Sequence, residues 1–167
     1  MVIKKQTKSG TVKGQLDLSQ TIIKARFFCV YQERHQQEVR DKIYGWGLHS
    51  NEVESIIAEL ISNDFINEER YAKTFAGGKF RIKKWGKVKI RIELKKKNIT
   101  NYCINKALEE IPEIEYSKTI KTVIFEKINT ANGKNDFEKK FKTGKYLISR
   151  GFESELVWAE LNRIKVG

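Results

Sequence analysis

The sequence contains very few residues that break or cross-link a chain, with one proline and two cysteines among 167 residues. Because helices need few breakers, a single proline favours a helical protein over a turn-rich β architecture. No signal-peptide pattern precedes Cys29 and Cys103, so we expect two reduced core cysteines, with a disulfide left open. No apolar run approaches the ~20 residues that a membrane span needs. We therefore expect a cytoplasmic protein that does not enter membranes.

Motifs for catalysis and for metal binding are also missing. His35 and His49 are the only histidines, and neither stands at a ligand-type spacing from a cysteine. The sequence has no GxxxxGK[ST], no GxSxG and no HExxH motif. Paired acids such as Glu68 and Glu69 fall at expected helix ends, where the helix dipole explains them. We expect no catalytic residue, no metal, no cofactor and no enzyme activity, and keep a nuclease built on scattered acids as an open alternative.

Positive charge is abundant and concentrated in one stretch. The chain has 33 Lys and Arg against 21 acids, a formal net charge of +12. The stretch 79–97 holds ten of these cations and a single acid, Glu93. A concentrated cationic surface marks a place where an anionic partner docks, whereas the plainer interpretation is a solvated face that maintains solubility. The aromatic residues Phe80 and Trp85 within the stretch favour the first interpretation.

The candidate binding residues follow from this charge. Lysines and arginines that contact phosphates release counterions, which gives affinity without sequence preference. Trp85 would stack on a base or pack between helices. Arg150 would contact a partner or cap its own helix end. The candidates from the basic stretch are Lys79, Arg81, Lys83, Lys84, Lys87, Lys89, Arg91, Lys95, Lys96 and Lys97.

Apolar residues recur at helical spacings over most of the chain. The first expected helix starts at Ser19 as its N-cap and places Ile22, Ile23, Phe27, Val30 and Tyr31 at such spacings. Further helices are expected over 35–46, from Ser50 to about 62, from Asn67 to an interruption at Gly77-Gly78, over 87–97, 101–110, 113–128, 137–149 and 154–165.

Three passes of this pattern align without a gap, at spacings of 51 and then 53 residues. Leu48, Ile99 and Phe152 share one column, and two residues later each pass has a residue typical of an N-cap. Apolar residues fill the columns at offsets −5, +5, +9 and +12, and the last three offsets share one helical face. These columns are Ile43/Leu94/Leu147, Val53/Ile104/Val157, Ile57/Leu108/Leu161 and Leu60/Ile111/Ile164, and the expected N-caps are Ser50, Asn101 and Ser154.

The repeats predict an all-α protein of three tandem three-helix repeats, packed as an elongated, curved array. We expect a flexible basic arm over 1–18, repeat 1 over 19–62, repeat 2, the most basic, over 63–111, and repeat 3 over 112–167. One segment conflicts with this, because residues 88–94 alternate apolar and charged as a basic β-hairpin would. We favour a helix over 87–97, which places Lys84, Lys87, Arg91 and Lys95 on one stripe opposite Ile90 and Leu94.

With these motifs in place, the sequence resembles the RecX family, the bacterial regulators of the RecA recombinase. The resemblance rests on LISNDFINEERYA (60–72), on YLISRGFESELVWAEL (146–161) and on the run between them that includes Gly86, Ile90, Leu94, Lys97 and Ile99. It covers about 25–164, and departs from the family pattern at Asn98, where a glycine is usual, and in the GWGL segment, 45–48.

The resemblance implies a monomeric helical-repeat protein that lies along a RecA–DNA filament. There it would limit strand exchange, ATP hydrolysis and co-protease activity, with the RecA filament and DNA as partners. The alternative is a general single- or double-stranded nucleic-acid-binding module without an obligate protein partner. Whether the basic stretch contacts DNA or an acidic protein surface stays open at this point.

Overall fold

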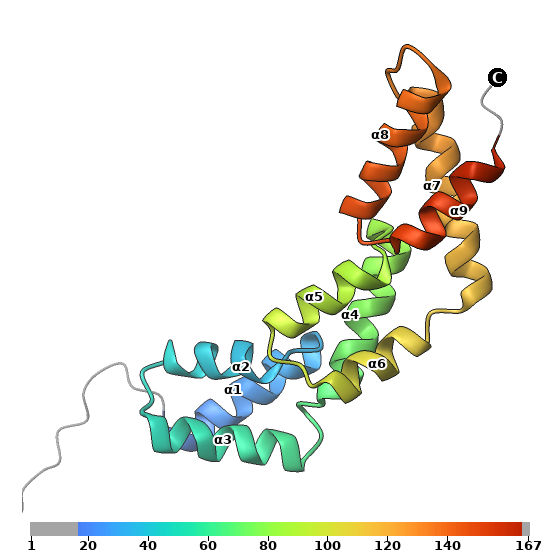
Figure 1. Ribbon diagram of the computed structural model, residues 1–167. Helices are drawn as coiled ribbons and strands as arrows, with labels where there is room; N and C mark the ends of the chain where they lie inside the picture. Colours follow the sequence, from blue (N-terminus) through green and yellow to red (C-terminus); the bar gives the residue numbers. More distant parts are fainter. Residues whose placement is uncertain (1–16, 165–167) are drawn as a thin grey trace, which may run out of the picture. The chain divides into compact units, whose positions relative to one another are not determined.

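The computed structural model describes residues 17–164, which form nine α-helices and no strand (Figure 1). The all-helical fold, with nine helices in this range, confirms the predicted fold class, whereas the curvature of the array stays a prediction. Residues 1–16 of the expected arm lie outside the described residues. The helices are α1 (Leu18–Tyr31), α2 (Gln36–Tyr44), α3 (Ser50–Ser62), α4 (Glu68–Lys83), α5 (Lys87–Lys96), α6 (Asn101–Glu109), α7 (Glu113–Thr130), α8 (Asp136–Ser149) and α9 (Ser154–Arg163).

The chain divides between Asn67 and Glu68 into two compact units. The first unit holds α1, α2 and α3, and the second holds α4 to α9. Each unit has a buried hydrophobic cluster of its own.

The repeat columns found in the sequence are columns of core residues. Leu48, Ile99 and Phe152 are buried, and so are the residues at offsets −5, +5 and +9 in all three passes. At offset +12, Leu60 and Ile111 are buried, while Ile164 packs half-buried against the second cluster. Equivalent columns therefore supply equivalent core positions in each three-helix group.

The first residues of α3, α6 and α9 are predicted correctly, but the predicted N-caps of these helices are wrong by one residue. Ser50, Asn101 and Ser154 are the first helical residues, and the N-caps precede them. Thr100 caps α6 through its hydroxyl, which accepts a hydrogen bond from the Cys103 N–H at 3.4 Å. The N-caps of α3 and α9 are His49 and Glu153, and α1 begins at Leu18 with Asp17 as its N-cap in place of Ser19.

In the first unit, α2 and α3 pack against each other and α1 packs against both. The apolar residues expected for α1 are only partly those of its core face: Ile22 packs against the first cluster, but Ile23, Phe27, Val30 and Tyr31 are each more than half exposed. The buried face instead carries small and polar residues, Thr21, Ala25 and Cys29. Because α1 has apolar side chains on opposite sides, periodicity alone does not select the side that faces the core.

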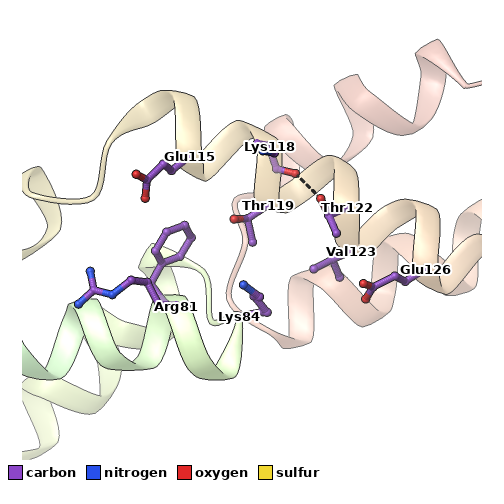
Figure 2. A pocket seen from close by; sticks show the side chains of 9 residues that line it. Arg81, Lys84, Glu115, Lys118, Thr119, Thr122, Val123 and Glu126 are labelled. Carbon is purple, nitrogen blue, oxygen red and sulfur yellow. Dashed lines mark hydrogen bonds between the residues drawn. The ribbon is translucent and has the colours of Figure 1, made fainter.

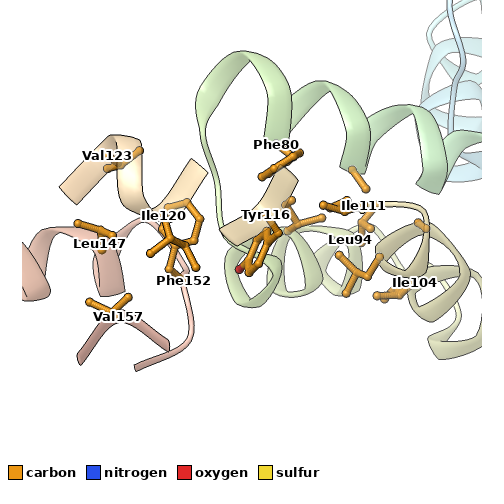
Figure 3. Packing of buried hydrophobic residues seen from close by; sticks show 14 of the residues in the cluster. Phe80, Leu94, Ile104, Ile111, Tyr116, Ile120, Val123, Leu147, Phe152 and Val157 are labelled. Atoms are coloured by element: carbon orange, nitrogen blue, oxygen red, sulfur yellow. The ribbon is translucent and has the colours of Figure 1, made fainter. Parts of the chain in front are cut away.

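In the second unit, one hydrophobic cluster runs through all six helices. Figure 3 shows Phe80 of α4, Tyr116 of α7 and Phe152 of the α8–α9 turn at its centre. The Tyr116 ring centroid lies 5.7 Å from that of Phe80 and 5.5 Å from that of Phe152.

The interruption predicted at Gly77-Gly78 is wrong, because α4 continues through both glycines to Lys83. Glycine costs about 1 kcal/mol relative to alanine inside a helix. Here the buried neighbours Ala72, Ala76 and Phe80 pack α4 into the core and offset that cost.

The β-hairpin alternative for the basic stretch is also wrong. Lys79–Lys83 belongs to α4, and 88–94 lies within α5. In a strand, Val88, Ile90, Ile92 and Leu94 would share one face. Instead Ile90 and Leu94 are fully buried while Val88 and Ile92 are exposed, as the helix predicted.

Candidate functional site

The α4–α5 connection is held against the turn between α8 and α9 by backbone contacts. Gly86, the N-cap of α5, donates its N–H to the Arg150 carbonyl at 2.9 Å, and Val88 donates to the Gly151 carbonyl at 3.0 Å. A Cβ on Gly86 would lie 2.1 Å from the carbonyl carbon and oxygen of Gly151. Gly86 therefore both starts a helix and permits a close backbone approach.

A buried tyrosine fixes the same junction from the side of α7. The Tyr116 hydroxyl accepts a hydrogen bond from the Lys87 N–H at 2.9 Å and donates one to Glu153 Oε2 at 2.5 Å. Burial, followed by the hydrogen bond to Glu153, raises the pKa of Tyr116. Tyr116 is not predicted from the sequence, since a tyrosine in the first turn of a helix carries no signal of such a role.

The ten predicted cations are brought together by α4, the connection and α5. Lys79, Arg81 and Lys83 lie in the last turns of α4, Lys84 lies in the connection, and Lys97 is the C-cap of α5. The remaining five lie on α5 itself: Lys87, Lys89, Arg91, Lys95 and Lys96.

Three of these cations are engaged by neighbouring polar side chains. Lys87 Nζ lies 2.5 Å from Glu113 Oε1, and Arg91 Nη1 donates to Asn105 Oδ1 at 2.8 Å. Lys96 Nζ lies 2.8 Å from Glu93 Oε1, and this hydrogen bond is the main cause that lowers the pKa of Glu93. The predicted stripe is therefore not uniform: Lys87 and Arg91 have partners within the second unit, and Lys84 lies outside α5.

Three other lysines surround two aromatic rings. Lys79 and Lys89 both reach the Trp85 ring, with Nζ atoms 5.0 and 4.7 Å from its centroid. Lys79 also lies 5.2 Å from the Phe75 centroid, and Lys97 lies 5.9 Å from it. Trp85 is half-buried against the core cluster, so it packs between helices and carries cations on its ring. We refer to these five residues as the lysine–aromatic cluster.

The remaining four cations, Arg81, Lys83, Lys84 and Lys95, are exposed and form no ion pair with the described residues. Arg81 and Lys84 line a groove of about 260 Å³ between the end of α4 and α7. In Figure 2 the α7 side of this groove carries Glu115, Lys118 and Thr119. Both signs of charge line this groove, and Lys83 and Lys95 lie outside it.

Arg150 is engaged within the protein. It is the C-cap residue of α8, but its guanidinium donates to the Lys83 carbonyl at the end of α4. Its side chain therefore caps the end of α4, whereas the sequence predicted a partner contact or a cap on the end of its own helix, α8.

The described residues contain no group of three or more His, Cys, Asp or Glu able to hold a metal ion. Cys29 and Cys103 are both buried and form no disulfide. Within 17–164, no helix combines the length and the apolar character that crossing a bilayer requires.

Comparison with known proteins identifies the family. A family model described as "RecX, second three-helix domain" matches residues 67–108. "Regulatory protein RecX" of Thermotoga maritima is 28% identical over 138 residues, which cover 82% of this chain and 80% of that protein. The Clostridium acetobutylicum protein of the same name is 30% identical over 134 residues, covering 77% of this chain and 59% of that protein.

Solved structures agree with these sequence relatives. The crystal structure of RecX from Lactobacillus salivarius matches with a TM-score of 0.78 and 25% identity, covering 88% of this chain and 97% of that chain. A second crystal structure, of a regulatory protein RecX, has the same fold, with a TM-score of 0.76, 19% identity, and coverage of 88% of this chain and 74% of that one. The chain belongs to the RecX family of regulatory proteins.

Proposed function

We propose that this protein regulates a RecA recombinase by binding the filament that RecA forms on DNA. In doing so it limits strand exchange, ATP hydrolysis and co-protease activity, and it acts without catalysing a reaction. Membership of a family whose relatives carry the name "Regulatory protein RecX" supports this role.

The structural observation that carries the proposal is a group of exposed cations along α4, the α4–α5 connection and α5 that have no acidic partner among the described residues: Arg81, Lys83, Lys84 and Lys95. Cations already neutralised by neighbouring carboxylates gain little from a second anion, whereas exposed cations without such a neighbour attract one. Several such charges within one region suit a polymer with repeated negative charge. A RecA–DNA filament would present such repeated negative charge through its DNA phosphates and through acidic side chains of RecA.

The close backbone contact at Gly86 gives this surface a fixed geometry. Because the start of α5 is hydrogen-bonded to the α8–α9 turn, the cations of α4 and α5 are held by the core of the second unit. Pre-organised charges lose less conformational freedom when they bind a partner.

The experiment is a titration of this protein into RecA that is hydrolysing ATP on single-stranded DNA. We expect the rate to collapse at amounts well below one molecule per RecA protomer, because blocking a filament affects many protomers. A fall in rate only when the protein saturates the DNA would instead indicate competition for phosphates.

A general nucleic-acid-binding module is the second candidate function. The lysine–aromatic cluster favours it, because aromatic rings among cations bind bases and phosphates together. A salt titration of binding to DNA without RecA separates the two candidates. Tight binding that does not change when RecA is added would support the second one.

A further inference from the structure

Three aromatic rings form a row on the surface of α8 and α9, apart from the basic stretch. Phe137 is 76% exposed in the first turn of α8, and Phe141, one turn later, is 44% exposed. Their centroids are 6.3 Å apart with planes inclined by 14°. Trp158 of α9 continues the row at 6.4 Å from Phe141, with planes inclined by 27°.

Part of this row is held in place before any partner arrives. A Cβ on Gly144 would lie 2.5 Å from Trp158 Cη2, so the indole lies directly on the backbone of α8. Trp158 also packs half-buried against the core cluster. At the other end, the Asn135 side chain accepts the Glu138 N–H at 2.9 Å and fixes the first turn of α8, which carries Phe137. Phe137 itself is largely exposed and contributes little to the core.

The α8 side of the row is cationic. Lys145 Nζ lies 5.0 Å from the Phe141 centroid. The segment 134–150 has six Lys or Arg and only two acids. Of the acids, Glu138 accepts the backbone N–H of Lys134 at 2.9 Å, which occupies one of its oxygens within the α7–α8 loop. An anionic partner with flat apolar groups complements such a surface better than an uncharged apolar one.

We propose that Phe137, Phe141, Trp158 and Lys145 form a binding surface for single-stranded nucleic acid. Unpaired bases stack on the exposed ring faces, and Lys145, with neighbouring lysines of α8, lies near the phosphates. A duplex does not fit this role, because its bases are already stacked on one another. The inference goes beyond the regulatory function proposed above, because it requires no recombinase.

Tryptophan fluorescence tests the proposal directly. The chain has three tryptophans, so Trp46→Phe with Trp85→Phe leaves Trp158 as the only one. We expect a single-stranded oligothymidylate to quench Trp158 fluorescence and a duplex of equal length to leave it nearly unchanged. Equal quenching by the duplex would overturn the proposal.

A pair of matched variants in the otherwise unaltered protein gives the second measurement. Phe137→Ala is expected to weaken binding of a dye-labelled oligothymidylate by about fivefold or more, from the loss of one stacked base. Phe125→Ala, which removes an exposed ring from α7, is the control and leaves the affinity unchanged. Equal affinities of the two variants would show that the row does not bind bases.

Inhibition of RecA by the same variants separates this inference from the proposed function. If Phe137→Ala weakens oligonucleotide binding and still inhibits RecA ATP hydrolysis, the inference holds and the regulatory function is unaffected. If Phe137→Ala binds the oligonucleotide normally and loses inhibition, the row contacts protein and the inference is wrong.

Discussion

At the scale of single residues, three positions share an unusual backbone conformation. Gly47, Asn98 and Gly151 each precede the central column residue of a repeat, and their φ angles are +90°, +59° and +88°. Left-handed geometry favours glycine and, after it, asparagine. Asn98 therefore keeps in the second repeat the turn that glycine forms in the other two.

Gly86 and Gly78 make a matched pair of glycines for testing the α4–α5 junction. In Gly86→Ala the added Cβ overlaps the Gly151 carbonyl, so we expect a loss of about 3 kcal/mol or more in the free energy of unfolding. Gly78→Ala meets no atom within 4 Å inside α4 and should gain about 1 kcal/mol. The measurement is urea unfolding of both variants. An equal change in the free energy of unfolding would show that the close approach at Gly86 does not contribute to stability.

Tyr116→Phe tests the buried hydroxyl. The change leaves the Lys87 N–H and Glu153 without their hydrogen-bond partner, and should cost about 1–3 kcal/mol. The pKa of Tyr116 is raised on folding, so its contribution to stability is present below pH ~10 and is lost as the pH rises further. The free energy of unfolding, measured from neutral to alkaline pH, should therefore fall less steeply in Tyr116→Phe than in the unaltered protein. A parallel fall in both would contradict the assignment.

At the scale of helices, the sequence predicts the segments better than their faces. Apolar periodicity predicted the nine helices between residues 17 and 164 and most of their core residues, because burial requires that periodicity. The apolar face of α1 could not be predicted, since both of its sides carry large apolar residues and only packing against α2 and α3 selects one. The continuity of α4 through Gly77 likewise depends on tertiary packing, which outweighs local propensity.

For the basic surface, too, the sequence predicts which residues are present better than it predicts their contacts. Sequence placed ten cations in one stretch, but which of them are neutralised depends on residues far along the chain, such as Glu113 and Asn105. Charge counting alone does not reveal these partners.

Lys83 and Lys95, at the ends of α4 and α5, test the basic surface at this scale. We expect Lys83→Glu with Lys95→Glu to weaken inhibition of RecA about tenfold or more, and to leave the helical circular dichroism unchanged. If the partner is DNA, the plot of log affinity against log salt concentration also becomes less steep, by the slope that roughly two phosphate contacts contribute.

The control carries the same change of net charge elsewhere in the second unit. Lys106→Glu with Lys121→Glu alters α6 and α7 and should inhibit RecA almost normally. Equal loss of inhibition in both pairs would mean that only the total charge matters.

At the scale of the whole molecule, each of the two compact units carries its own hydrophobic cluster. Ile43→Ala removes a fully buried side chain from the first cluster and should destabilise the first unit by about 2–5 kcal/mol. We expect amide hydrogen exchange to accelerate in α1, α2 and α3 and to stay slow in the core of α4 to α9. Uniform acceleration over all nine helices would show that the two units unfold as one.

The two cysteines give this division a chemical reporter that the chain already carries. Cys29 lies buried in α1 and Cys103 lies buried in α6, so each unit contains one shielded thiol. A thiol reagent added to the native protein can react with each sulfur only when the surrounding helices open. The two labelling rates, resolved by mass spectrometry, therefore time the opening of each unit separately, without any engineered probe.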